Sequence, residues 1–130
     1  MKEIKKLVVG NRIIESNVIT KTVHILGTEY EIIIDAPDEW LPENADGAMD
    51  QSLKRILIAK LEISRDSLKD LDSYRKKVLR HEIIHAFLYE SGLWENSGSS
   101  DAWGQDETIT DWIAIQFPKI LEAFKEAECI

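Results

Sequence analysis

Residues 78–89 read VLRHEIIHAFLY, and this stretch decides the fold. Apolar and aromatic residues recur through it at helical spacing from Tyr74 onwards, so a long helix is predicted. Either Asp72 or Ser73 can cap the start of this helix, and Gly92 is a natural C-terminal stop. The helix is expected to bury its apolar residues against a sheet built from the strands that precede it.

The segment before this helix is rich in Ile, Val and Thr and predicts strands. Thr20–Leu26 and Glu29–Ile34 are expected to pair across a turn at Gly27-Thr28. Residues 4–14 fit either another hairpin, which would turn at Gly10-Asn11, or a helix. The N-terminal part of the chain therefore supplies at least two strands of the sheet.

The other segments complete the expected order of elements. Residues 36–50 hold two of the three prolines and predict a loop, whereas the run from Lys54 to Leu61 predicts a strand buried on both faces. Polar connections are expected over residues 64–72 and 96–101. A final helix should run from about Asp106 to Ala127, with a bend at Pro118. Strands precede helices, so the fold class is α+β.

Composition and charge limit the kind of protein that this chain can be. Its 130 residues fit one domain, 1–130, and 44% hydrophobic with 31% charged residues is typical of a folded globular protein. The net charge of -8 disfavours nucleic-acid binding, and no apolar run is long enough for a membrane span. Cys129 is the only cysteine, and the short apolar run near the N-terminus is no secretory signal. A cytoplasmic, intracellular location is therefore expected.

The polar residues His81, Glu82 and His85 interrupt the apolar pattern of the predicted helix. The two histidines lie one helical turn apart and therefore project from the same face. Two imidazoles so placed can bind one Zn²⁺, and Glu82 can lie beside a water on its open coordination position. Burial of this trio is costly unless it has partners, and a cation supplies one. The alternative is a pair of core histidines that are satisfied by hydrogen bonds.

A catalytic zinc site usually has a third protein ligand. The remaining histidine, His24, is predicted to be structural in its strand. A metzincin-type third histidine is absent, because Leu88 and Ser91 stand where Gly and His would be. The third ligand is therefore expected among the downstream carboxylates, which are Glu90, Glu95, Asp101, Asp106, Glu107 and Asp111.

Glu107 is the preferred third ligand because it opens the final predicted helix. Asp111 lies one turn further on the same face, where it can accept the free ring N–H of a ligating histidine. Glu90 and Glu95 lie too near the end of the first helix to fold back easily, and Asp101 is the next choice. The alternative is that Glu107 and Asp111 bind no metal and lie at the start of the helix only because the positive end of its dipole stabilises acidic side chains there.

The pattern His81-Glu82-x-x-His85 followed by Glu107-x-x-x-Asp111 resembles the gluzincin zinc metallopeptidases. The likeness covers roughly residues 45–120 and is nearest to the small single-domain proteins of the ImmA/IrrE type and related phage or prophage proteins. It implies a minimal zincin-like domain, in which a small, mostly antiparallel sheet packs on the active-site helix and a C-terminal helix. It also implies that His81, His85 and Glu107 bind one Zn²⁺, that Glu82 is the catalytic base, and that Asp111 supports a histidine.

The resemblance further implies a metallopeptidase that hydrolyses a peptide or protein substrate, such as a regulatory protein, through a water activated by Glu82. It implies that the strand at residues 56–61 exposes an edge to which a peptide can add, the alternative being a strand paired on both sides. A zinc-stabilised module that binds a regulatory partner without cleavage is the second hypothesis. A hydrolase of nonpeptide substrates is the third, and the oligomeric state is left open.

The sequence does not decide the roles of two further sets of residues. A donor to the developing oxyanion is expected among Tyr74, Arg80, Tyr89 and the loop around Trp103, although each is an ordinary packing or surface residue as well. The four tryptophans either line a groove or belong to the core and its rim; they are Trp40, Trp94, Trp103 and Trp112.

Overall fold

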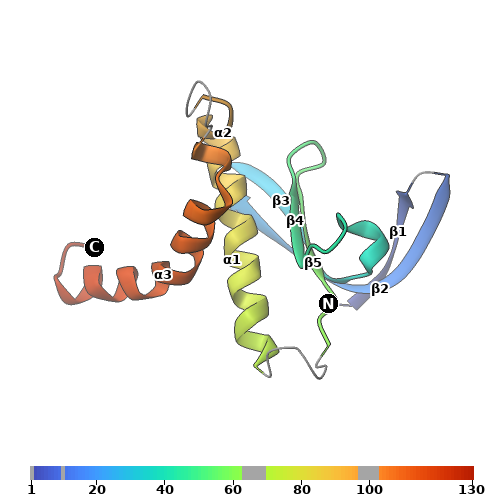
Figure 1. The fold of residues 1–130 in the computed structure, drawn as a ribbon, viewed down its shortest axis with the longest axis horizontal. Coiled ribbons are helices and arrows are strands. Elements are labelled where there is room, and N and C mark those ends of the chain that lie inside the picture. Colours follow the sequence, from blue (N-terminus) through green and yellow to red (C-terminus); the bar gives the residue numbers. More distant parts are fainter. Residues whose placement is uncertain (1, 10, 63–69, 97–102) are drawn as a thin grey trace.

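The computed structural model describes residues 2–9, 11–62, 70–96 and 103–130. They form a curled five-stranded sheet and two long helices, α1 (Leu71–Glu90) and α3 (Glu107–Glu126). Helix α1 packs on the sheet, and α3 contacts α1 on the side away from the strands (Figure 1). The α+β class is therefore confirmed, but the C-terminal helix packs on the first helix rather than on the sheet as expected.

The first three strands form an antiparallel meander: β1 (Lys2–Val9), β2 (Arg12–Ile25) and β3 (Thr28–Ala36). Residues 4–14 thus form the hairpin and not the helix, and β2 begins well before the predicted Thr20. Ile25 pairs with Thr28, so the turn consists of Leu26 and Gly27, both with positive φ, one residue earlier than predicted. Positive φ at both central residues matches the twist of a two-residue hairpin.

The strand predicted within residues 54–61 is β5 (Arg55–Ala59), and it lies inside the sheet. It pairs in parallel with β3 and antiparallel with β4 (Gly47–Asp50), so the strand order is β1-β2-β3-β5-β4. The prediction of an exposed edge at residues 56–61 is therefore wrong, because an apolar strand is buried best with neighbours on both sides. The prediction of a loop throughout residues 36–50 is also wrong. These residues contain β4, the open edge strand, and a short 3-10 helix, η1 (Asp38–Trp40).

At β3 and β5 both faces of the sheet are covered, as the continuous apolar run of β5 predicted. Ile56 and Ile58 join Ile25, Tyr30 and Ile32 beneath α1, where they pack on Val78 and Ala86. Leu57 points the other way and packs with Val18, Ile33 and Trp40. Trp40 is thus a core residue and lines no groove. Alternate residues of β3 and β5 face α1, and their close packing fixes the position of the helix on the sheet.

The N-cap of α1 lies two residues before Asp72, the earlier of the two predicted caps. Asp70 is the N-cap and accepts a hydrogen bond from the Ser73 backbone N–H at 3.1 Å. Gly92 has φ +87° and follows the last turn, as predicted for a C-terminal stop. A short helix, α2 (Leu93–Asn96), continues from there.

The end of α1 is tied to the sheet by Glu90. Its carboxylate accepts hydrogen bonds of 2.8 Å each from Thr28 Oγ1, Tyr30 Oη and Lys54 Nζ. These donors come from β3 and from the residue just before β5. The cluster therefore fixes the C-terminal half of α1, which carries the two histidines, relative to the strands.

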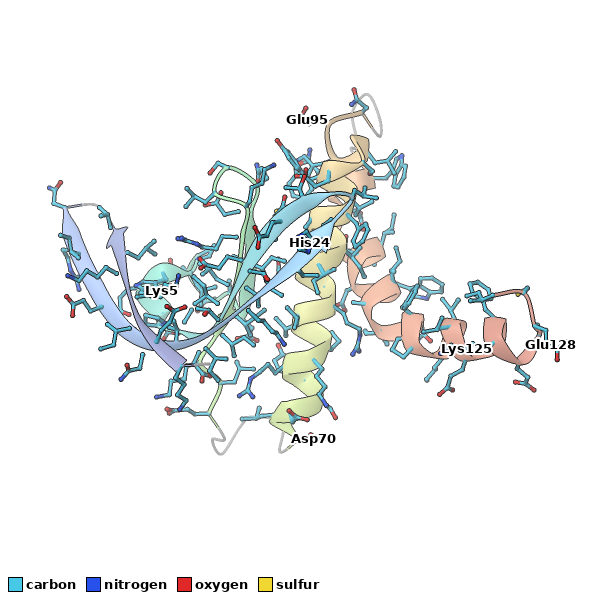
Figure 2. All side chains as sticks on the ribbon, turned by 180° about the vertical axis from the view of Figure 1, so that it is seen from behind. Lys5, His24, Asp70, Glu95, Lys125 and Glu128 are labelled. Atoms are coloured by element: carbon cyan, nitrogen blue, oxygen red, sulfur yellow. The ribbon has the colours of Figure 1, made fainter. Side chains whose placement is uncertain are left out.

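Helix α3 is capped by Asp106, which accepts from the Ile109 backbone N–H at 2.7 Å, and it bends near Pro118 (Figure 1). Pro118 has no N–H for the carbonyl of Ala114. Arg80 of α1 supplies the missing donor, since its Nε lies 2.6 Å from that oxygen. Beyond the bend the helix projects from the body of the molecule, and Lys125 lies on this outer part (Figure 2). In the described part of the chain no helix is long and apolar enough to cross a membrane.

Replacing Arg80 with Met should destabilise the protein. Ala114 is fully buried, so its carbonyl would lose a partner at a cost of about 1–3 kcal/mol in the free energy of unfolding, measured with urea. In a P118A background the residue at 118 can donate its own N–H to Ala114, and R80M should cost clearly less there. Equal costs in both backgrounds would show that Arg80 does not replace the proline's missing donor.

Glu90 should make stability depend on pH. The hydrogen bond from Lys54, with those from Tyr30 and Thr28, outweighs burial and holds the Glu90 pKa below its ordinary value. A carboxylate with a lowered folded pKa stabilises the fold above its unfolded pKa of about 4.3, and this contribution is lost as the pH falls further. The variant E90Q should therefore unfold more easily than the parent at neutral pH.

The difference between E90Q and the parent should shrink in acid, when unfolding is followed by denaturant titration at a series of pH values. Glu122 is exposed on α3 and provides the matched control, E122Q, for which no such convergence is expected. A pH-independent difference between E90Q and the parent would argue against an ionised Glu90 in the fold.

Candidate metal centre

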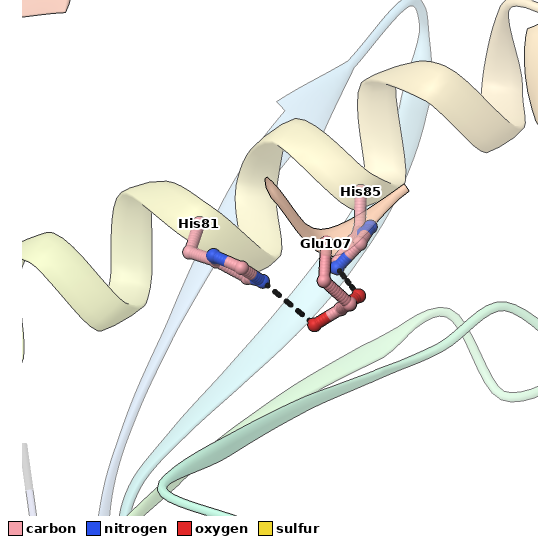
Figure 3. Close-up of side chains that lie close together, drawn as sticks. All are labelled: His81, His85 and Glu107. Carbon is pink, nitrogen blue, oxygen red and sulfur yellow. Dashed lines mark hydrogen bonds and ion pairs between the residues drawn. The ribbon is translucent and has the colours of Figure 1, made fainter. Parts of the chain in front are cut away.

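The centre lies where the first turn of α3 meets the middle of α1. His81 and His85 project from one face of α1, and Glu107, the first residue of α3, reaches between them (Figure 3). Glu107 Oε2 lies 3.3 Å from His81 Nε2, and Glu107 Oε1 lies 2.6 Å from His85 Nε2. One potential ligand atom from each of the three residues lies within 4.8 Å of the others. The two imidazole ring centroids are 4.7 Å apart.

His81 has a carboxylate oxygen at both ring nitrogens. Its Nδ1 lies 3.1 Å from Asp111 Oδ1, and its Nε2 faces Glu107. A neutral imidazole carries only one N–H, so it can donate to only one of these two oxygens. The other contact sets a nitrogen lone pair against a carboxylate unless a proton or a metal ion lies between them. Donation from Nδ1 to Asp111 leaves Nε2 free for a cation that Glu107 also binds, so this donor set fits a divalent metal.

His85 is deeply buried and favours its neutral form. Burial lowers the pKa of His85 and nearby His81 lowers it further, while Glu107 pulls in the opposite direction without cancelling the effect. Metal binding needs the neutral imidazole, so this environment suits a ligand. Its Nδ1 is buried without a hydrogen-bond partner in the described part of the chain. The two histidines thus differ, because only His81 has a carboxylate at Nδ1.

Glu82 is a buried acid with no hydrogen bond or ion pair in the described ranges. Burial raises its pKa to about 7, and the negative charge of Glu107 adds to this rise. Gly47 of β4 lies directly against it, since a Cβ added there would lie 3.1 Å from Glu82 Cγ and 2.7 Å from Val78 Cγ1. A carboxyl group with this pKa can both accept and release a proton near neutral pH.

Two adjoining hollows flank Glu82 between β4 and α1, and together they are called the groove. Both are lined by Gly47, Glu82 and Glu107. The hollow on the His81 side holds about 230 Å³, with Asp46, Tyr74, Lys77 and Asp111 in its wall. The hollow on the His85 side holds about 200 Å³ and is more apolar, with Pro42, Ala48, Met49 and Trp94. The Glu107 side chain is 74% exposed, so solvent reaches the centre.

The structure brings Glu107 and Asp111 to the histidines and keeps the other candidate ligands away from them. Glu90 is held by the sheet, Glu95 is exposed on α2, and Asp106 caps α3. Asp101 lies outside the described residues. His24 is not part of the His81, His85 and Glu107 cluster, and it is exposed on β2 rather than packed as predicted (Figure 2).

The structure also brings some candidates for the oxyanion donor to the groove and holds others away from it. Tyr74 lines the hollow on the His81 side, although its hydroxyl donates to Asp46. Arg80 is turned away to the carbonyl of Ala114, and Tyr89 packs near Trp94 with the Lys54 ammonium 4.8 Å from its ring centroid. Of these three side chains, Tyr74 is therefore the one that the structure brings to the groove.

The tryptophans do not form one groove. Trp94 lines the hollow on the His85 side, with its ring centroid 5.5 Å from that of His85. Trp103 and Trp112 are exposed on η2 (Trp103–Gln105) and α3. The hypothesis of a tryptophan-lined groove therefore holds for Trp94 only.

Sequence reasoning missed two neighbours of the centre. Gly47 and its short strand carry no local strand signal, because Gly and Asp are rare in strands. Lys77 was detectable, since it lies one turn before His81 on the same face of α1. Its Nζ lies 3.1 Å from Asp111 Oδ1. Asp111 is partly buried, which by itself raises a carboxyl pKa, but its bonds to Lys77 and His81 hold the pKa below its ordinary value.

Comparison with known proteins adds no further information: no family model, no curated protein and no solved structure matches this chain. The chemistry of the centre has to be inferred from its own geometry.

Removing Glu107 or Asp111 should weaken metal binding to different degrees. E107A deletes a ligand and should abolish measurable Zn²⁺ uptake, whereas D111A deletes a support and should lower the affinity about 10- to 100-fold. Competition with a chromogenic chelator measures both effects, and E122A on the exposed face of α3 is the control. Full affinity in E107A would place the third ligand elsewhere.

Proposed function

We propose that this chain is a zinc-dependent metallopeptidase with a minimal zincin-like fold. His81, His85 and Glu107 would hold the metal, and Glu82 would be the catalytic base. The observation that carries this proposal is the meeting of two imidazoles and a carboxylate from a second helix beside a buried, unpaired acid. A structural zinc site has no need of such an acid, whereas a hydrolytic site depends on one.

The roles of the residues follow from their positions. A bound Zn²⁺ would polarise the scissile carbonyl and lower the pKa of a bound water toward about 7. Glu82 would accept a proton from the attacking water and pass it to the leaving amine, because its buried carboxylate has no other partner in the described part of the chain and lines the groove. Asp111 holds the His81 ring through Nδ1. Tyr74 lines the hollow beside His81 and Glu82 and could donate to the oxyanion if its hydroxyl exchanged Asp46 for the substrate.

The edge of β4 offers a binding mode for an extended peptide. The carbonyl of Asp46 accepts from the Ala59 N–H, so it points into the sheet. Backbone groups of successive residues point to opposite sides, and those of Gly47 and Met49 therefore face the open edge. A peptide that adds to this edge as a further strand would lie along the groove, next to Glu82.

A second candidate function is a zinc-stabilised module that binds a regulatory partner without cleaving it. The modest size of the hollows favours this alternative, because about 200 and 230 Å³ is less than most small-molecule sites enclose. The buried acid Glu82 favours the peptidase. Both functions use the same groove, and both would engage a peptide or protein of phage or prophage regulation.

The variant E82Q separates the two functions. The zinc-loaded protein is incubated with a peptide library, and the cleavage products are identified by mass spectrometry. E82Q should keep its zinc and its fold but lose about 10²- to 10⁴-fold in cleavage rate, because the amide cannot accept the proton. The matched control E95Q, at an exposed acid, should cleave like the parent.

Cleavage by E82Q at the parental rate would remove Glu82 from the mechanism. If the zinc-loaded parent binds peptides or a protein partner stoichiometrically but yields no fragments, the binding module is the correct function.

A further inference from the structure

Lys77 and His81 share one oxygen atom of Asp111. Lys77 Nζ and His81 Nδ1 each lie 3.1 Å from Asp111 Oδ1. Lys77 and His81 are one turn apart on α1, whereas Asp111 comes from α3. The carboxylate is therefore gripped from α1 by two donors, only one of which belongs to the candidate metal ligands.

Lys77 is held more firmly than an ordinary surface lysine. Its side chain is 26% exposed, and its Nζ lies 5.2 Å from the centroid of the Tyr74 ring. The adjacent Lys76 forms an ion pair of the same length with Asp72, but there the two side chains are 69% and 70% exposed. An exposed pair of that kind contributes little, whereas a partly buried, well-supported one can orient its partner.

The position of Asp111 needs such support. Asp111 and Lys77 line the same hollow as Glu82 and Glu107, and Lys77 brings a positive charge to this group of acids. A carboxylate with His81 as its single donor would be free to rotate toward solvent or toward a bound cation. With Oδ1 held by Lys77, the oxygen stays opposite His81 Nδ1, and the imidazole keeps its proton there.

We infer that Lys77 is a positioning residue for the metal centre, which acts on His81 through Asp111. It keeps the His81 Nδ1–H pointed at Asp111 and so leaves the Nε2 lone pair directed at the space that Glu107 and His85 also face. This support matters more because His85 Nδ1 has no hydrogen-bond partner in the described ranges. The inference rests on the proposed metal site but not on peptidase activity.

The test measures Zn²⁺ affinity by chelator competition in the full chain and in the variants K77M, K77R and K76M. K77M should bind Zn²⁺ about three- to tenfold more weakly than the parent, because its support of His81 is lost. K77R should recover most of the affinity, since a guanidinium can also donate to Asp111. K76M removes a neighbouring charge that does not reach the centre and should bind like the parent.

A double-mutant cycle separates positioning from a general effect of charge. In a D111A background K77M should cause no further loss of affinity, because the route from Lys77 to His81 is already broken. Histidine ring ¹⁵N spectra of the metal-free protein provide a second measurement. The parent and K77R should show the His81 proton on Nδ1, and K77M should show a mixture of tautomers.

Three results would overturn the inference. Parental affinity in K77M alongside weak binding in D111A would leave the metal site intact and remove Lys77 from it. An equal loss from K77M with and without Asp111 would show an effect of charge alone. If the parent binds no Zn²⁺ at all, both the proposed function and this inference fail. The first two results differ from this one, because in them the parent still binds Zn²⁺ and only the role of Lys77 is lost.

Discussion

The contact of Glu107 with the two histidines depends on how α3 crosses α1. Asp106 starts α3 at the right residue, so that the side chain of Glu107 emerges opposite the middle of α1. Two cations of α1 then hold the crossing: Lys77 binds Asp111, and Arg80 binds the carbonyl of Ala114. The bend at Pro118 is part of this arrangement, because the carbonyl that the proline leaves unpaired is the one that Arg80 uses. The missing hydrogen bond at Pro118 thereby allows Arg80 to fix α3 to α1 near the proposed metal centre.

The sheet contributes to the centre through an edge strand of four residues. Because β5 is apolar on both faces, it occupies the interior of the sheet and leaves the shorter β4 at the edge. Gly47 then allows β4 to approach α1 so closely that Glu82 is shielded from water. This shielding is the main cause of the raised pKa of Glu82, since desolvation favours the neutral carboxyl group. The close approach of strand and helix thus tunes the acid that the proposed mechanism needs.

Acidic side chains are treated differently at the C-terminal end of α1 and around its middle. The chain is acidic, with a net charge of -8, yet two half-buried acids at the contacts of α1, Glu90 and Asp111, are well paired. Glu90 has three donors, and Asp111 has two. Glu82 differs from these two acids, because it is buried and has no partner in the described part of the chain, and an unpaired buried acid is costly unless it is used. This contrast between satisfied and unsatisfied acids is the main physical support for a catalytic role over a purely structural one.

By itself the sequence determined the features that depend on local periodicity: the long helix with His81 and His85 on one face, the capped helix from Asp106, and the buried strand at β5. It also favoured a carboxylate, and Glu107 among the candidates, as the third ligand of the proposed metal centre. The tertiary structure decided that Glu90 is bound by the sheet, that β4 is the open edge, and that Lys77 reaches Asp111. The contacts of Glu90 and Lys77 join residues 34 to 62 positions apart in the chain, and β4 has only four residues, so a local pattern carries no record of such pairings. Packing of the whole chain is what brings them together.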